Sequence, residues 1–201
     1  MPELPQTETL FLERDDGWLT VWLDRPETRN ALSAEMADEL LAVAHALRDD
    51  RAIRGVTFRG KGGTFCAGGD LKAFRAITEG GQSRAAVAAF SRRAGELFHA
   101  VNELPQVTLM LVEGAAMAGG LGLVCAGDVV AVTADAKFAL TETMLGIPPA
   151  QIAPLIVQRV GMAAARRIML TAARFDGEEA KRLGIADEVV GTAGDFATLE
   201  A

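Results

Sequence analysis

The chain has 201 residues, of which 50% are hydrophobic and 23% are charged, and its formal net charge is −7 at pH 7. This length and apolar content predict one well-buried, folded domain rather than a disordered chain. The negative charge argues against nucleic-acid binding, which needs a basic surface. Apolar runs such as residues 107–112 are far too short to cross a bilayer, so we expect no membrane partner.

Cysteine and histidine are scarce in this chain. Cys66 and Cys125 give no disulfide framework, and together with two histidines on helical stretches they assemble no metal-ligand cluster. The first eight residues are polar and acidic and lack the basic and apolar regions of a secretory signal. We therefore expect a cytoplasmic protein with reduced thiols and no bound metal.

The first predicted elements are a hairpin and a helix. Residues 9–13 and 18–23 alternate apolar and polar side chains around Asp15-Asp16-Gly17, which predicts two antiparallel strands joined by a tight turn. Ser33 is the expected N-cap of the helix that follows. The apolar stripe of this helix comprises Met36, Leu40, Ala44 and Leu47.

The rest of the chain repeats one unit, in which a strand ends in a glycine-rich loop and turns into a helix. The strands are expected at 55–59 and 107–112, and the helices from Asp70 and from about Ala118. Further strands are expected at 129–133, 137–140 and 188–190, with helices near 151–160, 162–172 and 177–183. This repetition predicts an α/β fold with ligand chemistry at the strand ends.

The two glycine-rich loops, residues 65–72 and 114–122, are the most informative segments. A strand that ends in glycines and opens a helix points unpaired backbone N–H groups outward, with the positive end of the helix dipole behind them. Two such loops could aim two N–H groups at one oxygen and so stabilise an oxyanion.

These loops resemble the crotonase superfamily, the enoyl-CoA hydratases and isomerases, and the resemblance runs from residues 18–26 and 29–33 to residues 180–190. It implies an α/β fold of the crotonase type, a ββα superhelix or spiral, in which two main-chain N–H groups hold the carbonyl of an acyl-CoA thioester. It also implies that coenzyme A belongs to the substrate and that no metal or redox cofactor is needed.

The resemblance assigns the oxyanion donors to the N–H groups of Gly69 and Gly119 and proton transfer to Glu142. The second catalytic glutamate of the best-known hydratases falls at Gly122, so this chain has one acid where they have two. Glu142 must then act twice, or a substrate group or another residue must hold the water. The segments expected to border coenzyme A contain Arg29, Ala31, Ala67, Gly69, Asp70, Leu71, Lys72 and Gly119.

Several roles in these segments stay open at this stage. Arg29 and Lys72 could contact phosphates as cations or be solvated surface charges. Asp70 is expected to be a helix N-cap rather than an acid–base group, and Cys66 is expected to pack beside its loop.

Residues 146–161, with 4–10 and 173–180, are similar to isohexenylglutaconyl-CoA and 3-methylglutaconyl-CoA hydratases. The resemblance therefore implies a hydratase acting on a branched 2-enoyl-CoA. An isomerase with Glu142 as a proton shuttle and a non-catalytic acyl-CoA-binding relic are the alternatives.

Two expectations concern the end of the chain and its assembly. Residues 1–191 are expected to form the acyl-CoA-binding core, and residues 192–201 the start of a truncated C-terminal helical segment with Asp195 as its cap. The family resemblance and the apolar helices after residue 150 imply a homotrimer or a hexamer.

Overall fold

A computed structural model describes residues 4–70 and 83–199. Its main sheet has six strands in the order β1-β2-β3-β4-β6-β8, of which only β1 runs antiparallel to its neighbour. The strands are β1 Leu10–Asp15, β2 Trp18–Leu23, β3 Gly55–Gly60, β4 Val107–Val112, β6 Val129–Thr133 and β8 Glu188–Val190. A second sheet pairs β5 (Ala115–Met117) with β7 (Lys137–Ala139) in parallel.

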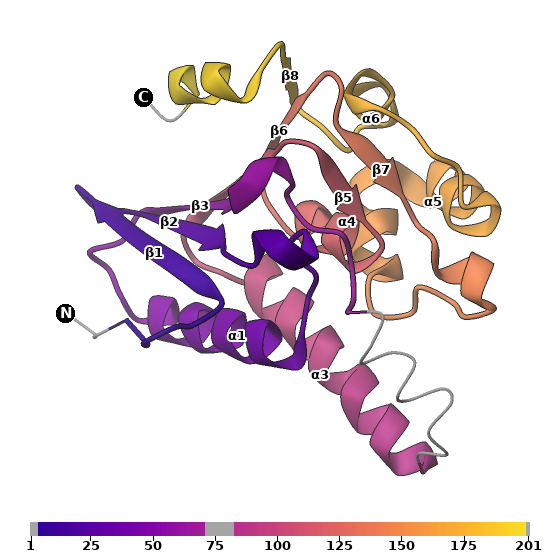
Figure 1. The fold of residues 1–201 in the computed structure, drawn as a ribbon, viewed down its shortest axis with the longest axis horizontal. Coiled ribbons are helices and arrows are strands. Elements are labelled where there is room, and N and C mark those ends of the chain that lie inside the picture. Colours follow the sequence, from indigo (N-terminus) through magenta and orange to yellow (C-terminus); the bar gives the residue numbers. More distant parts are fainter. Residues whose placement is uncertain (1–3, 71–82, 200–201) are drawn as a thin grey trace.

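The helices lie mainly below the sheet and at one end of it (Figure 1). They are α1 Ala34–Arg48, α3 Arg84–Asn102, α4 Gly119–Cys125, α5 Ala153–Thr171 and α6 Gly177–Leu183, with 3₁₀ turns η1 Pro26–Thr28, η2 Lys61–Gly63, η3 Glu142–Leu145 and η4 Ala193–Thr198. The helices α1 and α3 pack against each other. Parallel strands joined through helices confirm the predicted α/β class.

Local sequence signals place most of these elements. The β1–β2 hairpin turns at Asp16 and Gly17, which both have positive φ. The Ser33 hydroxyl oxygen accepts a hydrogen bond from the Met36 N–H, so Ser33 is the N-cap of α1 as expected. The two helices predicted on either side of residue 161 appear as one element, α5, which is interrupted at Gly161 by a φ of 75°.

The strand β4 separates two apolar clusters, because successive side chains of a strand point to opposite faces. Met110 and Val112 belong to the main core, whereas Leu109 and Leu111 pack with Phe196 in a smaller cluster on the other face. Phe196 lies in η4, which therefore covers part of the sheet face opposite the main core.

Two local expectations are wrong. Residues 114–117 were expected to be loop, but 115–117 form β5, which pairs with β7. Asp195 is not the cap of the last turn: Thr192 is the N-cap, and Asp195 is at the third helical position, where its carboxylate accepts from the Thr192 N–H in a capping box. The helix expected from Asp70 lies outside the described residues.

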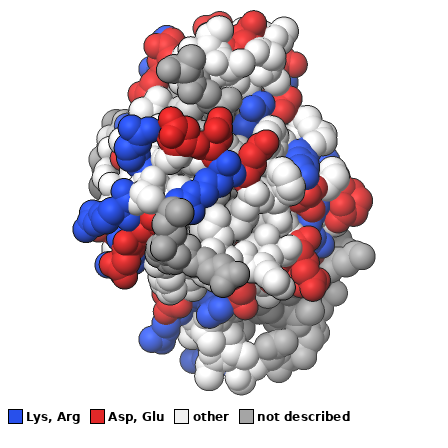
Figure 2. Space-filling model, turned by 90° about the vertical axis from the view of Figure 1, so that its left-hand side faces the viewer, with Lys and Arg blue, Asp and Glu red and all other residues white. Residues whose placement is uncertain are grey.

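Basic and acidic side chains are interspersed on the face drawn in Figure 2, which looks at the molecule from the left-hand side of Figure 1. Among the described residues this face carries both signs of charge around a largely uncharged area. The described part of this face therefore lacks a continuous basic surface of the kind that nucleic-acid backbones attract.

Candidate active site

The two glycine-rich loops lie side by side because hydrogen bonds join their backbones. The Cys66 N–H donates to the Ala115 carbonyl at 2.9 Å, and the Met117 N–H donates to the Cys66 carbonyl at 3.0 Å. One residue earlier, the Phe65 N–H donates to the Glu113 carbonyl at 3.0 Å. The chain therefore leaves β3 and β4 at the same level, and the two loops that follow these strands lie side by side.

A second set of bonds fixes the first loop from its other side. The Leu32 N–H donates to the Gly68 carbonyl at 2.8 Å, and the Asp70 N–H donates to the Leu32 carbonyl at 3.1 Å. This is a parallel bridge between Leu32 and Gly69. Such a bridge uses the carbonyl before Gly69 and the N–H after it, so the N–H of Gly69 itself takes no part.

The N–H of Gly119 is available for a similar reason. Gly119 is the first residue of α4, so its N–H has no acceptor within the helix. A Cβ atom built on Gly119 would stand 3.9 Å from the Gly69 nitrogen, which shows that the two glycine backbones are neighbours. The structure therefore brings together the two predicted donors.

The entry into α4 is strained. Ala118 has a φ of 47° and a ψ of −120°, a conformation that a non-glycine residue rarely adopts. Its N–H donates to the Ala139 carbonyl at 2.8 Å and its carbonyl accepts from the Gly122 N–H at 3.0 Å. Strain of this kind is concentrated at functional sites, where surrounding contacts hold it in place.

Glu142 is brought to the second loop by the small sheet. In that sheet Met117 pairs with Ala139. Gly119 follows Met117 by two residues and Glu142 follows Ala139 by three, so both lie just beyond the same pair of strands. Glu142 opens η3 there, and its Oε2 atom is buried without a hydrogen-bond partner among the described residues. Burial raises the pKa of the Glu142 carboxyl. A partly desolvated carboxylate with one unpartnered oxygen suits proton transfer.

Most of the predicted coenzyme A segments are also adjacent. The Arg29 carbonyl accepts from the Ala67 N–H at 2.9 Å, so residues 29–31 lie against the first glycine-rich loop. The Arg29 side chain is exposed. Leu71 and Lys72 lie outside the described residues, as does the helix that Asp70 was expected to cap.

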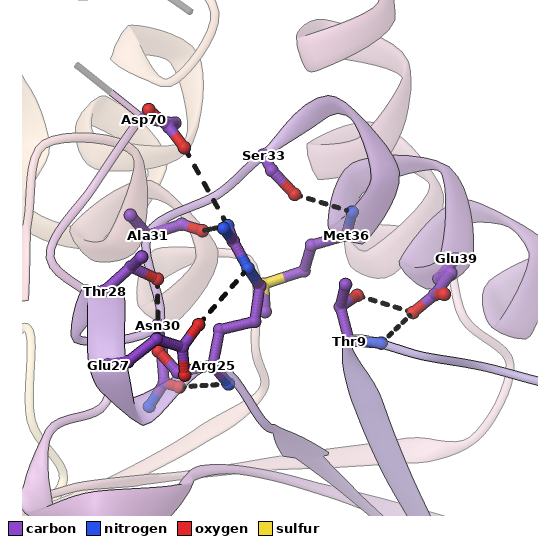
Figure 3. Close-up of polar contacts among 10 residues, drawn as sticks. All are labelled: Thr9, Arg25, Glu27, Thr28, Asn30, Ala31, Ser33, Met36, Glu39 and Asp70. Carbon is purple, nitrogen blue, oxygen red and sulfur yellow. Dashed lines mark hydrogen bonds and ion pairs between the residues drawn. The ribbon is translucent and has the colours of Figure 1, made fainter. Parts of the chain in front are cut away.

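Arg25 is a residue of this region that the sequence analysis missed. Figure 3 shows its guanidinium between Ala31, Asp70 and Glu27. One terminal nitrogen donates to the Ala31 carbonyl at 3.1 Å and lies 3.9 Å from the nearer Asp70 oxygen, while Nε lies 3.9 Å from Glu27. Arg25 thus links the segment before α1 to the residue after Gly69. Its position two residues after the end of β2 was the available signal.

Asn30 lies inside a segment that was predicted to border coenzyme A, but its own structural role was missed. It is fully buried, with a φ of 55°. Its side-chain oxygen accepts from the Arg25 N–H at 2.9 Å, and its side-chain nitrogen donates to the carbonyls of Lys61 and Thr64. Asn tolerates this left-handed conformation better than most residues, which was a possible signal. Asn30 holds the turn after β2 against the turn after β3.

The two cysteines play no visible chemical role. Both are buried free thiols, and burial raises the pKa of each to about 12. The Cys66 sulfur accepts from the Gly68 N–H at 3.4 Å, which confirms that Cys66 packs beside its loop. Within residues 4–70 and 83–199, no group of three or more His, Cys, Asp or Glu side chains is placed to hold a metal ion. No helix in the same ranges has the length and apolar character needed to cross a membrane.

The structure places the Gly69 and Gly119 backbones next to each other and the partly buried carboxyl of Glu142 just beyond β7, the strand that pairs with β5. Two backbone N–H donors that share one oxygen suit the polarisation of a carbonyl group. The family described as Enoyl-CoA hydratase/isomerase matches residues 13–196. The chain therefore belongs to the enoyl-CoA hydratase/isomerase family, which confirms the resemblance seen in the sequence.

Solved and curated relatives agree. The structure of Pseudomonas aeruginosa AtuE matches with a TM-score of 0.92 and 47% identity, over 96% of this chain and 74% of that one. The Homo sapiens enoyl-CoA hydratase domain-containing protein 2, mitochondrial, is 34% identical over 88% of this chain and 59% of its own length. The Mus musculus methylglutaconyl-CoA hydratase, mitochondrial, is 31% identical over 89% of this chain and 56% of its own length. The chain spans about three-fifths of the length of these two curated relatives.

Proposed function

We propose that the chain is an enoyl-CoA hydratase that adds water to a branched 2-enoyl-CoA. The observation that carries this proposal is the adjacency of Gly69 and Gly119, two backbones with available N–H groups, near the segment that carries Glu142. Relatives named as hydratases support the same reaction.

The proposed mechanism begins with the thioester carbonyl accepting from the N–H groups of Gly69 and Gly119. These hydrogen bonds withdraw electrons from the β-carbon. They also stabilise the negative charge that develops on the thioester oxygen in the enolate. Glu142 takes a proton from water as the water oxygen bonds to the β-carbon. The same carboxyl then returns a proton to the α-carbon, so the product has gained one water and Glu142 is again ionised.

The branched acyl chain is the finer part of the proposal. It is supported by the similarity of residues 146–161 to hydratases of branched, carboxylated substrates, and by the named activity of the mouse relative. The Arg29 and Ala67 segments would hold the coenzyme A part of the substrate.

One observation favours a second candidate, an enoyl-CoA isomerase. Gly122 supplies no second acid, and a side chain at that position has no room, because a Cβ built there would lie 2.8 Å from Ile152 Cβ. A single carboxylate is enough to move a proton between the α- and γ-carbons without any water. Glu142 would then act as a proton shuttle.

The experiment is a mass measurement on a panel of linear, branched and carboxylated enoyl-CoA thioesters incubated with the purified chain. We expect a branched substrate to gain the mass of one water. A product of unchanged mass with a displaced double bond would instead support the isomerase. Binding of thioesters without any turnover would contradict both and indicate an acyl-CoA-binding relic.

We also propose that the chain is a homotrimer or a hexamer. Four large apolar side chains on η3 and α5 are exposed, at 54–68% of their full area: Met144, Leu145, Met162 and Leu170. Contiguous apolar patches mark interaction surfaces, and we propose that these four side chains contribute to one. Light scattering at micromolar concentration should give about three or six times the 21.2 kDa chain mass, and a monomer or a dimer would contradict the proposal.

A further inference from the structure

Gly122 differs from the other glycines of its loop because the Ile152 side chain packs against it. Gly122 is in α4, three residues after Gly119, so the two lie on one face of the helix. A Cβ built on Gly122 would lie 2.8 Å from the Cβ of Ile152, and its distance to the Ile152 Cγ2 would be shorter still. Real Cβ atoms essentially never come this close to their neighbours.

Ile152 cannot move aside easily. It is 2% exposed and belongs to the main core. It is also the residue before α5, and its N–H donates to the Pro149 carbonyl at 3.2 Å while its carbonyl accepts from the Ile156 N–H at 3.1 Å. Backbone bonds on both sides therefore fix where this side chain packs.

The same segment of chain carries Glu142 and Ile152. The Ile147 N–H donates to the Glu142 carbonyl at 3.2 Å, which folds the start of this segment back on η3. One connection therefore carries both residues: Glu142 opens η3 just beyond β7, and Ile152 packs over Gly122 of α4. Glu142 at one end of this connection is polar, whereas Ile152 at the other end is apolar.

We propose that Ile152 is a specificity-determining residue, because it fills the space above Gly122 and so restricts the site to reactions that one carboxylate can carry out. This inference rests on the proposed function. It identifies Gly122 and Ile152 as the two residues that limit which reactions the site can catalyse. Residues 122 and 152 act as one packing unit, and an acid at position 122 requires the removal of the isoleucine.

The packing part is tested by a double-mutant cycle that needs no substrate. Gly122→Ala alone should lower the Tm by roughly 3–10 °C, because the added methyl overpacks the core. In the Ile152→Gly background the same change should leave the Tm unchanged or raise it, since alanine favours helix more than glycine does. Glycine is accepted at the position before a helix, so Ile152→Gly keeps the turn. An equal lowering in both backgrounds would overturn the proposal.

The reaction part compares two double variants that differ only in charge. Gly122→Glu with Ile152→Gly should hydrate a linear 2-enoyl-CoA about 10-fold or more faster than Gly122→Gln with Ile152→Gly, because only the first supplies a second acid. Equal rates would overturn the claim about specificity. If the parent chain turns over no enoyl-CoA, the proposed function fails, yet the Tm cycle still decides whether the two residues form one packing unit.

Discussion

The two glycine-rich loops offer the same kind of donor but are held in different ways. The Gly119 loop opens a helix whose first turn is mostly buried, so packing of the core fixes its direction. Gly69 is exposed, and its backbone is held by the bridge to Leu32 and by the contact of Arg25 with Asp70. One donor therefore depends on apolar packing and the other on a polar clamp.

The glycines themselves reflect this difference. A Cβ built on Gly120, in the second loop, would lie 2.9 Å from the Cys66 Cβ, whereas one built on Gly69 would meet nothing within 4 Å. The second loop needs glycine because its backbone packs closely against the first. At Gly69 glycine leaves open space, which the proposed thioester would occupy.

The largest effect is expected at Glu142, which lies outside both glycine-rich loops. Glu142→Gln keeps the shape of the side chain and removes its ability to accept a proton, so kcat should fall by about 10²–10⁴-fold. Thioester binding should stay nearly unchanged, because the donors are backbone groups. Steady-state kinetics and a binding titration measure both quantities. Glu178→Gln on exposed α6 is the matched control, and full turnover by Glu142→Gln would contradict the assignment.

The next effect separates the two donors. A methyl group added by Gly119→Ala would lie 3.3 Å from Leu32 Cδ1, 3.5 Å from Phe98 Cζ and 3.9 Å from the Gly69 nitrogen, so it would enter the space beside the Gly69 N–H. Loss of access to an oxyanion donor should lower kcat by about 10²-fold. Gly69→Ala points its methyl into open space and should fold with an unchanged Tm. Equal kcat for Gly119→Ala and wild type would argue against a shared oxygen.

A smaller effect tests the polar clamp of the first loop. Arg25→Gln should lower kcat by about 10-fold, because a displaced Gly69 N–H misaligns the carbonyl. Arg25→Lys keeps the charge and should recover part of the loss. The Tm should fall by a few degrees, because the partly buried Arg25 side chain also donates a hydrogen bond to the Ala31 carbonyl, which contributes about 1 kcal/mol.

The control for the clamp is Arg93→Gln, which breaks the Arg93–Asp38 ion pair on the surface of α3 and α1. This variant should keep the wild-type kcat. A rise in KM with unchanged kcat in Arg25→Gln would contradict a role in positioning the donor.

The smallest effect is a pH dependence that comes from Glu142. Burial raises the pKa of Glu142, so this carboxyl ionises at a higher pH than an ordinary Glu. Because only the ionised form acts as a base, kcat/KM should rise with pH above the usual range for Glu. The same shift means that the folded state gains stability at low pH and loses it as pH rises through the raised pKa. Glu142→Gln cannot ionise, so its unfolding free energy relative to wild type should increase over that pH range. Denaturant titrations at several pH values measure this difference, and a flat difference would contradict it.

Local signals in the sequence predicted much of the fold. The Asp16-Gly17 turn and the Ser33 cap depend on neighbours a few residues away, so their chemistry is visible in a short window. The strand β5 has three residues in a segment rich in alanine and glycine, which shows no alternation. The role of Asp195 was misjudged because the capping box needs Thr192 as well.

The site was predicted less completely. Matching loops indicated Gly69 and Gly119, and the structure places their backbones together. Arg25 and Asn30 were missed because their partners, such as Asp70 and Lys61, lie more than thirty residues away in the chain. The space over Gly122 also depends on a distant residue, Ile152. The catalytic roles, the oligomeric state and the cytoplasmic location stay predictions.

The burial of both cysteines has a practical consequence for spectroscopy. Cys66 and Cys125 are the only thiols of the sequence, and their high pKa values leave almost no reactive thiolate at neutral pH. A single cysteine introduced at an exposed position such as Glu178 would therefore react selectively with a fluorescent or spin label. The wild-type chain serves as its own unlabelled background, so a probe on the surface can report on thioester binding without removal of either native cysteine.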